Sequence, residues 1–306
     1  MGKRSFVRES RTHCGTDYQD VAVYPMTDRE KRKTRNRKEV LSSPAQKNLN
    51  DRNAKRYFRQ LVKTNFGAGD LAVHPTFAQE PESYEEAEKW LHKYIRRLKY
   101  ARKKAGLDPL KYIAVIEQGT RSNRLHIHMF VNGGLPEEQV KALWYRERGT
   151  KIKPAMPLGL IRTDTLHPEL FEDGLNRIAA YMAGDTTDKR RREDNRPKNK
   201  RRWIQSNNLD KPWRGRPNDS KYTARRLEKL ARLPEDCEEV RTFWAKKYPE
   251  WSIYSIEKSL NPETGRTSWY LEMKRRENLQ CEKRTRPPNS RRSSSGRRTT
   301  GGGGQP

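Results

Sequence analysis

The sequence predicts an α+β protein with an antiparallel sheet centred on a β-hairpin. Residues 111–118 and 124–132 alternate their side chains with period two and predict two strands, joined by the polar turn GTRSNR. Around this hairpin the predicted order is strand, helix, strand, strand, helix, helix, which is typical of α+β proteins. The chain shows no internal repeat, and its 306 residues are enough for one large domain or two modest ones.

Two helices and a strand are predicted before the hairpin. The first helix spans residues 44–66, with Ser43 as its N-cap. An extended run follows at residues 71–77, LAVHPTF, in which Pro75 cannot donate a ladder hydrogen bond. The clearest helix, residues 83–106, has acidic residues in its first turn and basic residues in its last. Its apolar stripe comprises Trp90, Leu91, Tyr94, Ile95 and Leu98.

Four helices and two strands are predicted after the hairpin. Amphipathic patterns predict the helices, and two runs of β-branched and aromatic residues around the turn NPETG predict a second hairpin. The helices span residues 135–145, 173–184, 223–233 and 237–248, and the strands span residues 252–260 and 267–275.

The distribution of charge and apolar residues predicts three regions. Residues 1–41 are basic and polar, and apart from a short strand at 21–25 they predict an N-terminal arm that does not pack. Residues 42–280 carry the apolar periodicity of a folded domain. Residues 281–306 are rich in Arg, Ser and Gly, which predicts a disordered basic tail.

The overall charge indicates a polyanionic partner. Lys and Arg number 67 against 39 Asp and Glu, for a formal net charge of +28. Nucleic acid is the most common partner of such a chain, and an anionic membrane surface is the alternative. No apolar run approaches the roughly 18 residues that cross a bilayer, and no secretory signal is visible. With only three widely spaced cysteines, we expect a cytoplasmic protein that binds DNA and no membrane.

Two histidines on the second hairpin strand predict a metal site. His126 and His128 are one residue apart, so both point to the same face of the strand. Glu117 on the preceding strand can lie opposite or diagonal to them. Two imidazoles and one carboxylate suit octahedral Mg²⁺ or Mn²⁺, and the softer imidazole favours Mn²⁺. The alternative is an exposed hairpin face on which two histidines lie close together by chance.

A tyrosine in the predicted helix 173–184 is a candidate nucleophile. Tyr181 lies toward the edge of the apolar face that Leu175, Ile178, Ala179 and Met182 form. A phenol at such a position can attack a scissile phosphate that a bound metal polarises. The alternative is a tyrosine that only packs at the rim of the core.

These residues together resemble the HUH endonucleases, the single-tyrosine initiators of rolling-circle replication. More narrowly, five stretches are similar to phage and plasmid replication-associated proteins of Gram-positive bacteria, and they occur in the expected order within residues 42–212. The stretches are SSPAQKNLNDRNAKRYFRQLVKTNF, GDLAVHPTFA, KYIAVIEQGTRSNRLHIHMFVNGG, DGLNRIAAYMAG and KRRWIQSNNLDKP.

The resemblance implies a fold and a reaction. The fold is an antiparallel sheet of about five strands with helices packed on it, and the metal ligands lie on the central strands. The reaction nicks one DNA strand at an origin, forms a 5′-phosphotyrosine on Tyr181 and leaves a 3′-OH that primes synthesis. The same chemistry rejoins the strand after rolling-circle replication. No GxxxxGK[ST] motif is present, so a host helicase is expected to open the duplex.

The chain departs from this family at two positions. The family usually carries a lysine three residues after the tyrosine, and Gly184 occupies that position here. Lys189 or Arg190 is a candidate substitute. The first family motif, usually an apolar and threonine strand, contains Pro75. His74 and Thr76 in this motif are expected to line the site.

Two other readings remain open. A conjugative relaxase or single-tyrosine transposase would share the chemistry, although relaxases usually carry a third histidine where Glu117 stands. A non-catalytic origin-binding protein would bind the same DNA without the cleavage chemistry.

Several residues are candidates for DNA contacts. The basic stretch 189–202 is suited to phosphate contacts. Trp203, Trp213 and Tyr222 flank basic residues and are candidates to stack on unpaired bases.

Overall fold

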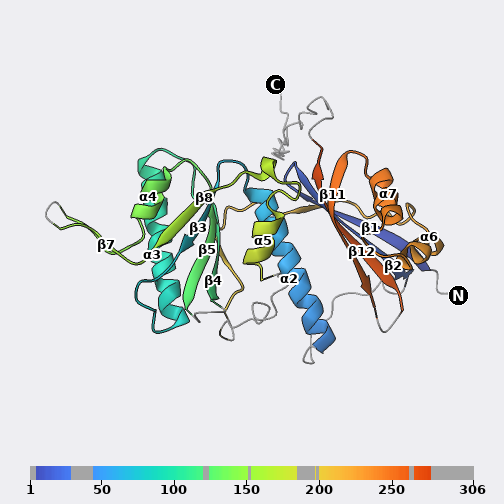
Figure 1. Ribbon diagram of the computed structural model, residues 1–306, viewed down its shortest axis with the longest axis horizontal. Helices are drawn as coiled ribbons and strands as arrows, with labels where there is room; N and C mark the ends of the chain where they lie inside the picture. The colour runs from blue at the N-terminus through green and yellow to red at the C-terminus, as the bar shows by residue number, and fades with distance from the viewer. Residues whose placement is uncertain are drawn as a thin grey trace, which may run out of the picture. The chain divides into compact units, whose positions relative to one another are not determined.

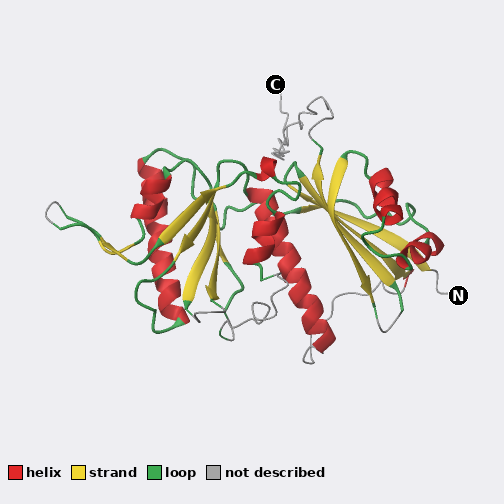
Figure 2. Cartoon of the chain, viewed as in Figure 1, coloured by secondary structure: helices red, strands yellow, loops and turns green. Residues whose placement is uncertain are grey.

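The computed structural model describes residues 5–28, 44–119, 124–150, 153–184, 197, 200–261 and 265–276. The chain divides into two units, Met1–Arg276 and Glu277–Pro306, and the second unit, with the predicted tail, lies outside the described residues. The described part of the first unit contains two five-stranded antiparallel sheets and a two-stranded ribbon (Figures 1 and 2). The predicted α+β class is therefore confirmed.

The first sheet, here the hairpin sheet, is the five-stranded antiparallel sheet that the resemblance implies. Its central strand is β5, so the predicted histidines lie in the middle of the sheet. The helices α3 (Tyr84–Lys104) and α4 (Glu137–Ala142) connect its strands in the order β-α-β-β-α-β. The strand order is β8 (Ile161–Thr165), β3 (Leu71–Pro75), β5 (Leu125–Val131), β4 (Tyr112–Gln118) and β9 (Ile204–Gln205).

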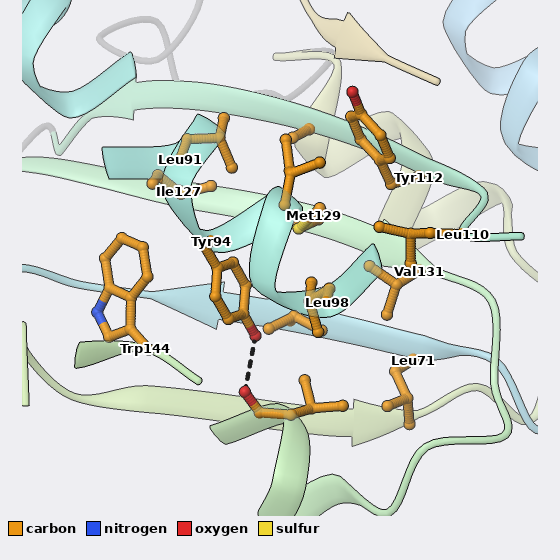
Figure 3. Close-up of a cluster of buried hydrophobic side chains, with 14 of the residues drawn as sticks. Leu71, Leu91, Tyr94, Leu98, Leu110, Tyr112, Ile127, Met129, Val131 and Trp144 are labelled. Carbon is orange, nitrogen blue, oxygen red and sulfur yellow. Dashed lines mark hydrogen bonds between the residues drawn. The ribbon is translucent and has the colours of Figure 1, made fainter. Parts of the chain in front are cut away.

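Helix α3 covers one face of the hairpin sheet (Figure 3). Ser83 caps the helix, because its side chain accepts a hydrogen bond from the backbone amide of Glu86. The hydroxyl of Tyr94 donates to the carbonyl of Val140 at 3.0 Å, which satisfies the one polar atom that this aromatic side chain brings into the core. The core comprises Leu91, Tyr94, Ile95 and Leu98 of the predicted stripe packed against Ile127, Met129, Val131, Tyr112 and Ala114.

Helices α2 (Pro44–Asn65) and α5 (Asn176–Met182) pack on the other face of the hairpin sheet. Along β4 and β5, the side chains on this face alternate with the side chains that pack against α3. Its buried cluster comprises Phe58, Leu61 and Val62 of α2, Ala179 and Met182 of α5, and Ile113 and Phe130 of the sheet. The candidate metal ligands therefore lie on the same face as α5.

The second sheet, here the terminal sheet, corrects the prediction for the N-terminal region. Residues 5–27 were expected to belong to a basic arm with one short strand, but they form two paired strands of ten residues each. Helices α6 (Ala224–Ala231) and α7 (Glu238–Lys247) pack on one face of this sheet. The strand order is β10 (Trp213–Arg214), β1 (Ser5–Cys14), β2 (Tyr18–Thr27), β12 (Thr267–Arg275) and β11 (Trp251–Leu260).

The physical reason for this correction is charge pairing between distant parts of the chain. Arg8 donates to both carboxylate oxygens of Asp219 at 2.7 Å, and Lys221 donates to Glu9 at 2.8 Å. Arg8 and Glu9 of β1 are thus paired with partners more than two hundred residues away. A local count of charges does not contain this information.

A buried ionic network joins α2 to the terminal sheet. The ammonium group of Lys63 lies 2.7 Å from a carboxylate oxygen of Asp20 and 3.1 Å from one of Glu272. Arg59 also contacts Glu272, at 3.3 Å. All four side chains are buried. Displacement of α2 from the terminal sheet would leave these buried charges unpaired, which is strongly unfavourable. The network therefore favours this one placement of α2 against the sheet.

The remaining described elements are short. They are the ribbon strands β6 (Tyr145–Glu147) and β7 (Met156–Pro157) and the 3₁₀ turn Pro168–Leu170. Among the helices of the described ranges, none is both long and apolar enough to span a membrane.

Candidate metal centre and nucleophile

The register of the central hairpin brings the three predicted metal ligands together. Glu117 on β4 lies directly opposite His126 on β5, and Val115 lies opposite His128. Residues that face each other in an antiparallel pair share one face of the sheet, as do alternate residues along a strand. Glu117, His126 and His128 therefore project together, as the alternation along the sequence predicts.

The distances between these side chains suit a single ion. One ligand atom from each of the three residues lies within 4.8 Å of the others. The Oε2 atom of Glu117 lies 3.4 Å from Nε2 of His128 and 3.9 Å from Nε2 of His126. The His128 side chain is 7% exposed, against 19% for Glu117 and 25% for His126. The cluster is thus closed on the His128 side and accessible from the His126 side.

An unsatisfied atom indicates that the cluster fits a cation. Nε2 of His128 is buried and forms no hydrogen bond with any described residue. A buried polar atom without a partner is unfavourable by about 1–3 kcal/mol, so its presence calls for an explanation. A divalent cation held by His128, His126 and Glu117 would satisfy this atom. The mixed nitrogen and oxygen donor set suits Mn²⁺ or Mg²⁺.

His74 contacts the centre from the neighbouring strand. Strand β3 continues in register with β5 as far as Thr76, which bridges to His126, so His74 lies opposite His128. The two Nδ1 atoms are 2.7 Å apart, and Nε2 of His74 lies 3.7 Å from a carboxylate oxygen of Asp164. The hydroxyl of Thr76 donates to the carbonyl of Leu160 instead of facing the cluster.

The protonation of His74 follows from its surroundings. Burial and the neighbouring His128 lower the pKa of His74 to about 4, so this imidazole is neutral near pH 7. A neutral His74 whose Nε2–H faces Asp164 can accept a hydrogen bond at Nδ1 from Nδ1–H of His128. This arrangement leaves the lone pair of His128 on Nε2, where a metal ligand needs it.

Helix α5 brings the predicted nucleophile to the centre. Ala179 and Met182 lie on the buried face of helix α5. Tyr181 lies at the edge of that face and is 46% exposed. The Tyr181 ring lies edge-on to His128, with the ring centroids 5.4 Å apart and an interplanar angle of 88°. The sequence predicts a tyrosine at the edge of the apolar face, and only the fold places it next to a metal ligand.

Contacts at both ends hold α5 in place, and sequence reasoning did not identify them. Before the helix, Gly174 adopts a φ of +54°, and a Cβ there would lie only 2.0 Å from the hydroxyl oxygen of Tyr18. After the helix, the ammonium group of Lys55 on α2 donates to the carbonyl of Gly184 at 3.0 Å. Lys55 thus places a cation beside the backbone of Gly184, the residue at which the sequence resemblance implies a lysine. Lys189 and Arg190, the predicted substitutes, lie outside the described residues.

The aromatic residues predicted to stack on DNA occupy different environments. Tyr222 is buried in the core under the terminal sheet. Trp203 is partly buried and packs edge-on against Phe58 with a centroid distance of 5.4 Å. Trp213 is 60% exposed on strand β10. Most of the basic stretch 189–202 lies outside the described residues.

One comparison with known proteins connects this site to replication. Residues 72–189 match the family model of the replication-associated protein ORF2/G2P, a segment that contains Glu117, His126, His128 and Tyr181. The comparisons with curated proteins and with solved structures gave no match. The matched segment indicates a replication-associated protein, and such a role favours DNA as the partner.

Proposed function

We propose that this protein is a replication initiation endonuclease that nicks one DNA strand at an origin and rejoins it after rolling-circle replication. The observation that carries the proposal is the convergence of Tyr181 with the cluster of Glu117, His126 and His128. Independent support comes from the match of the same segment to a replication-associated family. The replicon is expected to be a phage or plasmid of a bacterial host, in keeping with the sequence resemblance.

The chemistry assigned to Tyr181 is a phosphoryl transfer. Its phenolic oxygen attacks the scissile phosphorus, the bond from phosphorus to the 3′ oxygen breaks, and a bond from phosphorus to Tyr181 forms. The phenolic proton passes to solvent, and the departing 3′ oxygen takes up a proton. The 5′ end of the DNA is then held as a tyrosyl phosphodiester, and attack by a later 3′-OH reverses the reaction.

The metal ligands have a defined part in this scheme. Glu117, His126 and His128 would hold a Mg²⁺ or Mn²⁺ ion, which polarises the phosphate and offsets the charge that develops on it. The edge-on contact of Tyr181 with His128 keeps the phenol next to this centre. His74 orients His128 through its Nδ1 contact and stands outside the ligand set, which favours an initiator over a relaxase with three histidine ligands.

The partners follow from the same scheme. The substrate is expected to be the single-stranded form of the origin, in keeping with the sequence resemblance. A host helicase is expected to supply strand opening, since the sequence has no nucleotide-binding motif of the GxxxxGK[ST] type.

The deciding experiment detects a covalent protein–DNA adduct. Single-stranded DNA carrying the origin of the encoding replicon is incubated with the full-length protein and Mn²⁺, with and without EDTA. The products are resolved on a denaturing protein gel. We expect a metal-dependent adduct with the native chain and none with Tyr181→Phe. Tyr100→Phe is a matched control, because Tyr100 is an exposed tyrosine on α3 outside the site.

The outcomes separate the alternatives. An adduct that Tyr181→Phe abolishes and Tyr100→Phe retains supports the assigned nucleophile. Binding of origin DNA without an adduct under any divalent metal would contradict the endonuclease and identify a non-catalytic origin-binding protein. A relaxase or transposase would form the adduct on a transfer origin or an element end instead of a replication origin.

A further inference from the structure

A second feature of the molecule, on the terminal sheet, is an exposed tryptophan that is rigidly held. Trp213 is 60% exposed, which is unusual for a large aromatic side chain in a soluble protein. Its ring stacks on His13, with centroids 4.9 Å apart and an interplanar angle of 30°. One face of the indole is thus covered by an imidazole, while the side chain as a whole stays accessible to solvent.

The backbone of the terminal sheet fixes this pair. His13 and Trp213 are cross-strand partners where β1 pairs with β10 at the edge of the sheet. The amide of Gly215 donates to the carbonyl of Arg11 at 3.0 Å. The amide and carbonyl of Asn218 both bond to Glu9, at 3.0 and 2.8 Å. The backbone of the segment 213–218 is therefore held along β1, so little backbone freedom remains to be lost when a ligand binds.

The charge of this edge is positive. Lys211, Arg214 and Arg216 are all exposed, and none of them forms an ion pair or side-chain hydrogen bond with another residue in the described ranges. The nearby carboxylates of Glu9, Asp219 and Asp210 are already paired, with Lys221, Arg8 and Lys111 respectively. Three exposed cations without a carboxylate partner among the described residues therefore lie within three residues of Trp213 in the chain, in the segment that forms the edge of this sheet.

We infer that His13, Trp213, Lys211, Arg214 and Arg216 form a binding site for single-stranded DNA, distinct from the candidate metal centre. The indole stacks on an unpaired base, and the three cations contact the phosphates on either side. Duplex DNA does not offer a free base face, so an aromatic platform selects the unpaired strand. The cations contribute salt-dependent affinity without reading the sequence. The site would hold a displaced strand, and it does not depend on the proposed nicking reaction.

The test measures equilibrium binding in EDTA, so that no cleavage takes place. A fluorescein-labelled oligothymidylate is titrated with the full-length protein and followed by fluorescence anisotropy at several salt concentrations. We expect Trp213→Ala to weaken binding about tenfold, because the variant loses the aromatic face on which the base stacks. Trp213→Phe should restore most of the affinity. The pair Arg214→Gln and Arg216→Gln should reduce the slope of log affinity against log salt by about 1.4, since each single-strand phosphate contact contributes about 0.7.

Matched controls separate the site from general basicity. Tyr100→Ala removes an aromatic side chain that is 71% exposed on α3, and Arg225→Gln removes an exposed cation on α6. Both should leave the affinity for the oligothymidylate unchanged. Unchanged binding by Trp213→Ala, or an equal loss for a duplex of the same length, would overturn the inference. Because Trp213 lies outside the metal centre, Trp213→Ala should still form the Tyr181 adduct at saturating protein. The adduct assay therefore tests the proposed nicking reaction, and the anisotropy titration tests the strand-binding site independently.

Discussion

His74 and His128 face each other across strands β3 and β5 with their Nδ1 atoms 2.7 Å apart. This contact determines which nitrogen of His128 is available to a metal. A proton shared between the two Nδ1 atoms keeps the Nε2 lone pair of His128 directed at Glu117 and His126. Loss of a residue that holds a ligand in its correct tautomer typically lowers metal affinity about tenfold to a hundredfold.

The first prediction concerns this orientation. We expect His74→Ala to weaken Mn²⁺ binding about tenfold to a hundredfold, because His128 loses the partner that fixes its tautomer. Isothermal titration calorimetry with Mn²⁺ measures the effect. His92→Ala is the matched control, since His92 is an exposed histidine on α3. Equal Mn²⁺ affinity in His74→Ala and the native chain would refute the orienting role.

The second prediction concerns Lys55, which contacts the end of helix α5. Its ammonium group donates to the carbonyl of Gly184, two residues beyond the last residue of α5, and a cation there is also favourable for the helix dipole. We expect Lys55→Met to slow adduct formation by Tyr181 about tenfold, because small displacements of a nucleophile have large effects on rate. Mn²⁺ affinity should be unchanged.

The control for Lys55 is Lys47→Met, which removes an exposed lysine from the same helix. A similar loss of rate in both variants would mean that α2 contributes only general positive charge. A fall in Mn²⁺ affinity in Lys55→Met would mean that the metal centre itself is disturbed.

The third prediction concerns the strained turn before α5. Gly174→Ala introduces a Cβ 2.0 Å from the hydroxyl oxygen of Tyr18 at a residue with φ +54°. We expect a loss of about 1–3 kcal/mol in the free energy of unfolding from the backbone conformation and the steric overlap together. Urea denaturation measures it. Gly106→Ala is the comparison, because Gly106 has φ +67° and no atom within 4 Å of its Cβ position, so it reports backbone strain alone. A loss no larger than that of Gly106→Ala would contradict the steric contribution.

The fourth prediction concerns acid stability. Burial alone would raise the pKa of Glu272, but Lys63 and Arg59 outweigh it and hold this pKa below its ordinary value. The folded pKa therefore lies below the unfolded one. The stabilisation is fully present above the unfolded pKa of about 4.3 and is lost as pH falls through the folded pKa.

We expect Glu272→Gln to lower the free energy of unfolding at pH 7 by about 3–5 kcal/mol, because Lys63 and Arg59 lose a buried partner. The difference between the variant and the native chain should begin to shrink as pH falls below the unfolded pKa of about 4.3. It should be lost only as pH falls through the lower folded pKa of Glu272, where the native carboxylate becomes protonated. Urea denaturation across this pH range measures both effects. Glu228→Gln on the exposed face of α6 should show neither. A pH-independent difference for Glu272→Gln would exclude the ionic explanation.

Several parts of the site could be predicted from the sequence because they are local. The alternation of side chains in a strand and a short turn between neighbouring strands are sufficient to place Glu117 near His126 and His128. The amphipathic pattern of residues 173–184 likewise places Tyr181 at the edge of an apolar face. These features depend on residues close together in the chain, and the structure confirms them.

The terminal sheet could not be predicted in the same way. Strand β1 mixes charged and polar residues with few apolar ones, and β1 and β2 pair with strands β10 and β12, which lie far away in the chain. Asp20 and Tyr270, for example, are hydrogen-bonded although 250 residues separate them. The local composition of residues 1–41 therefore predicts an arm. In the folded chain, residues far away in the sequence pair with the charges of β1 and complete the sheet around β1 and β2.

The sequence by itself determined the fold class, the central hairpin and the clustering of the three candidate metal ligands, because short-range periodicity specifies which side chains share a face. Only the tertiary structure decided that Tyr181 lies edge-on to His128, that His74 contacts His128 through its Nδ1 atom, and that Trp213 stays exposed while Tyr222 is buried. Each of these relationships joins elements that are far apart in the chain. Their geometry follows from how helices and sheets pack to bury apolar surface and pair charges, which no local pattern records.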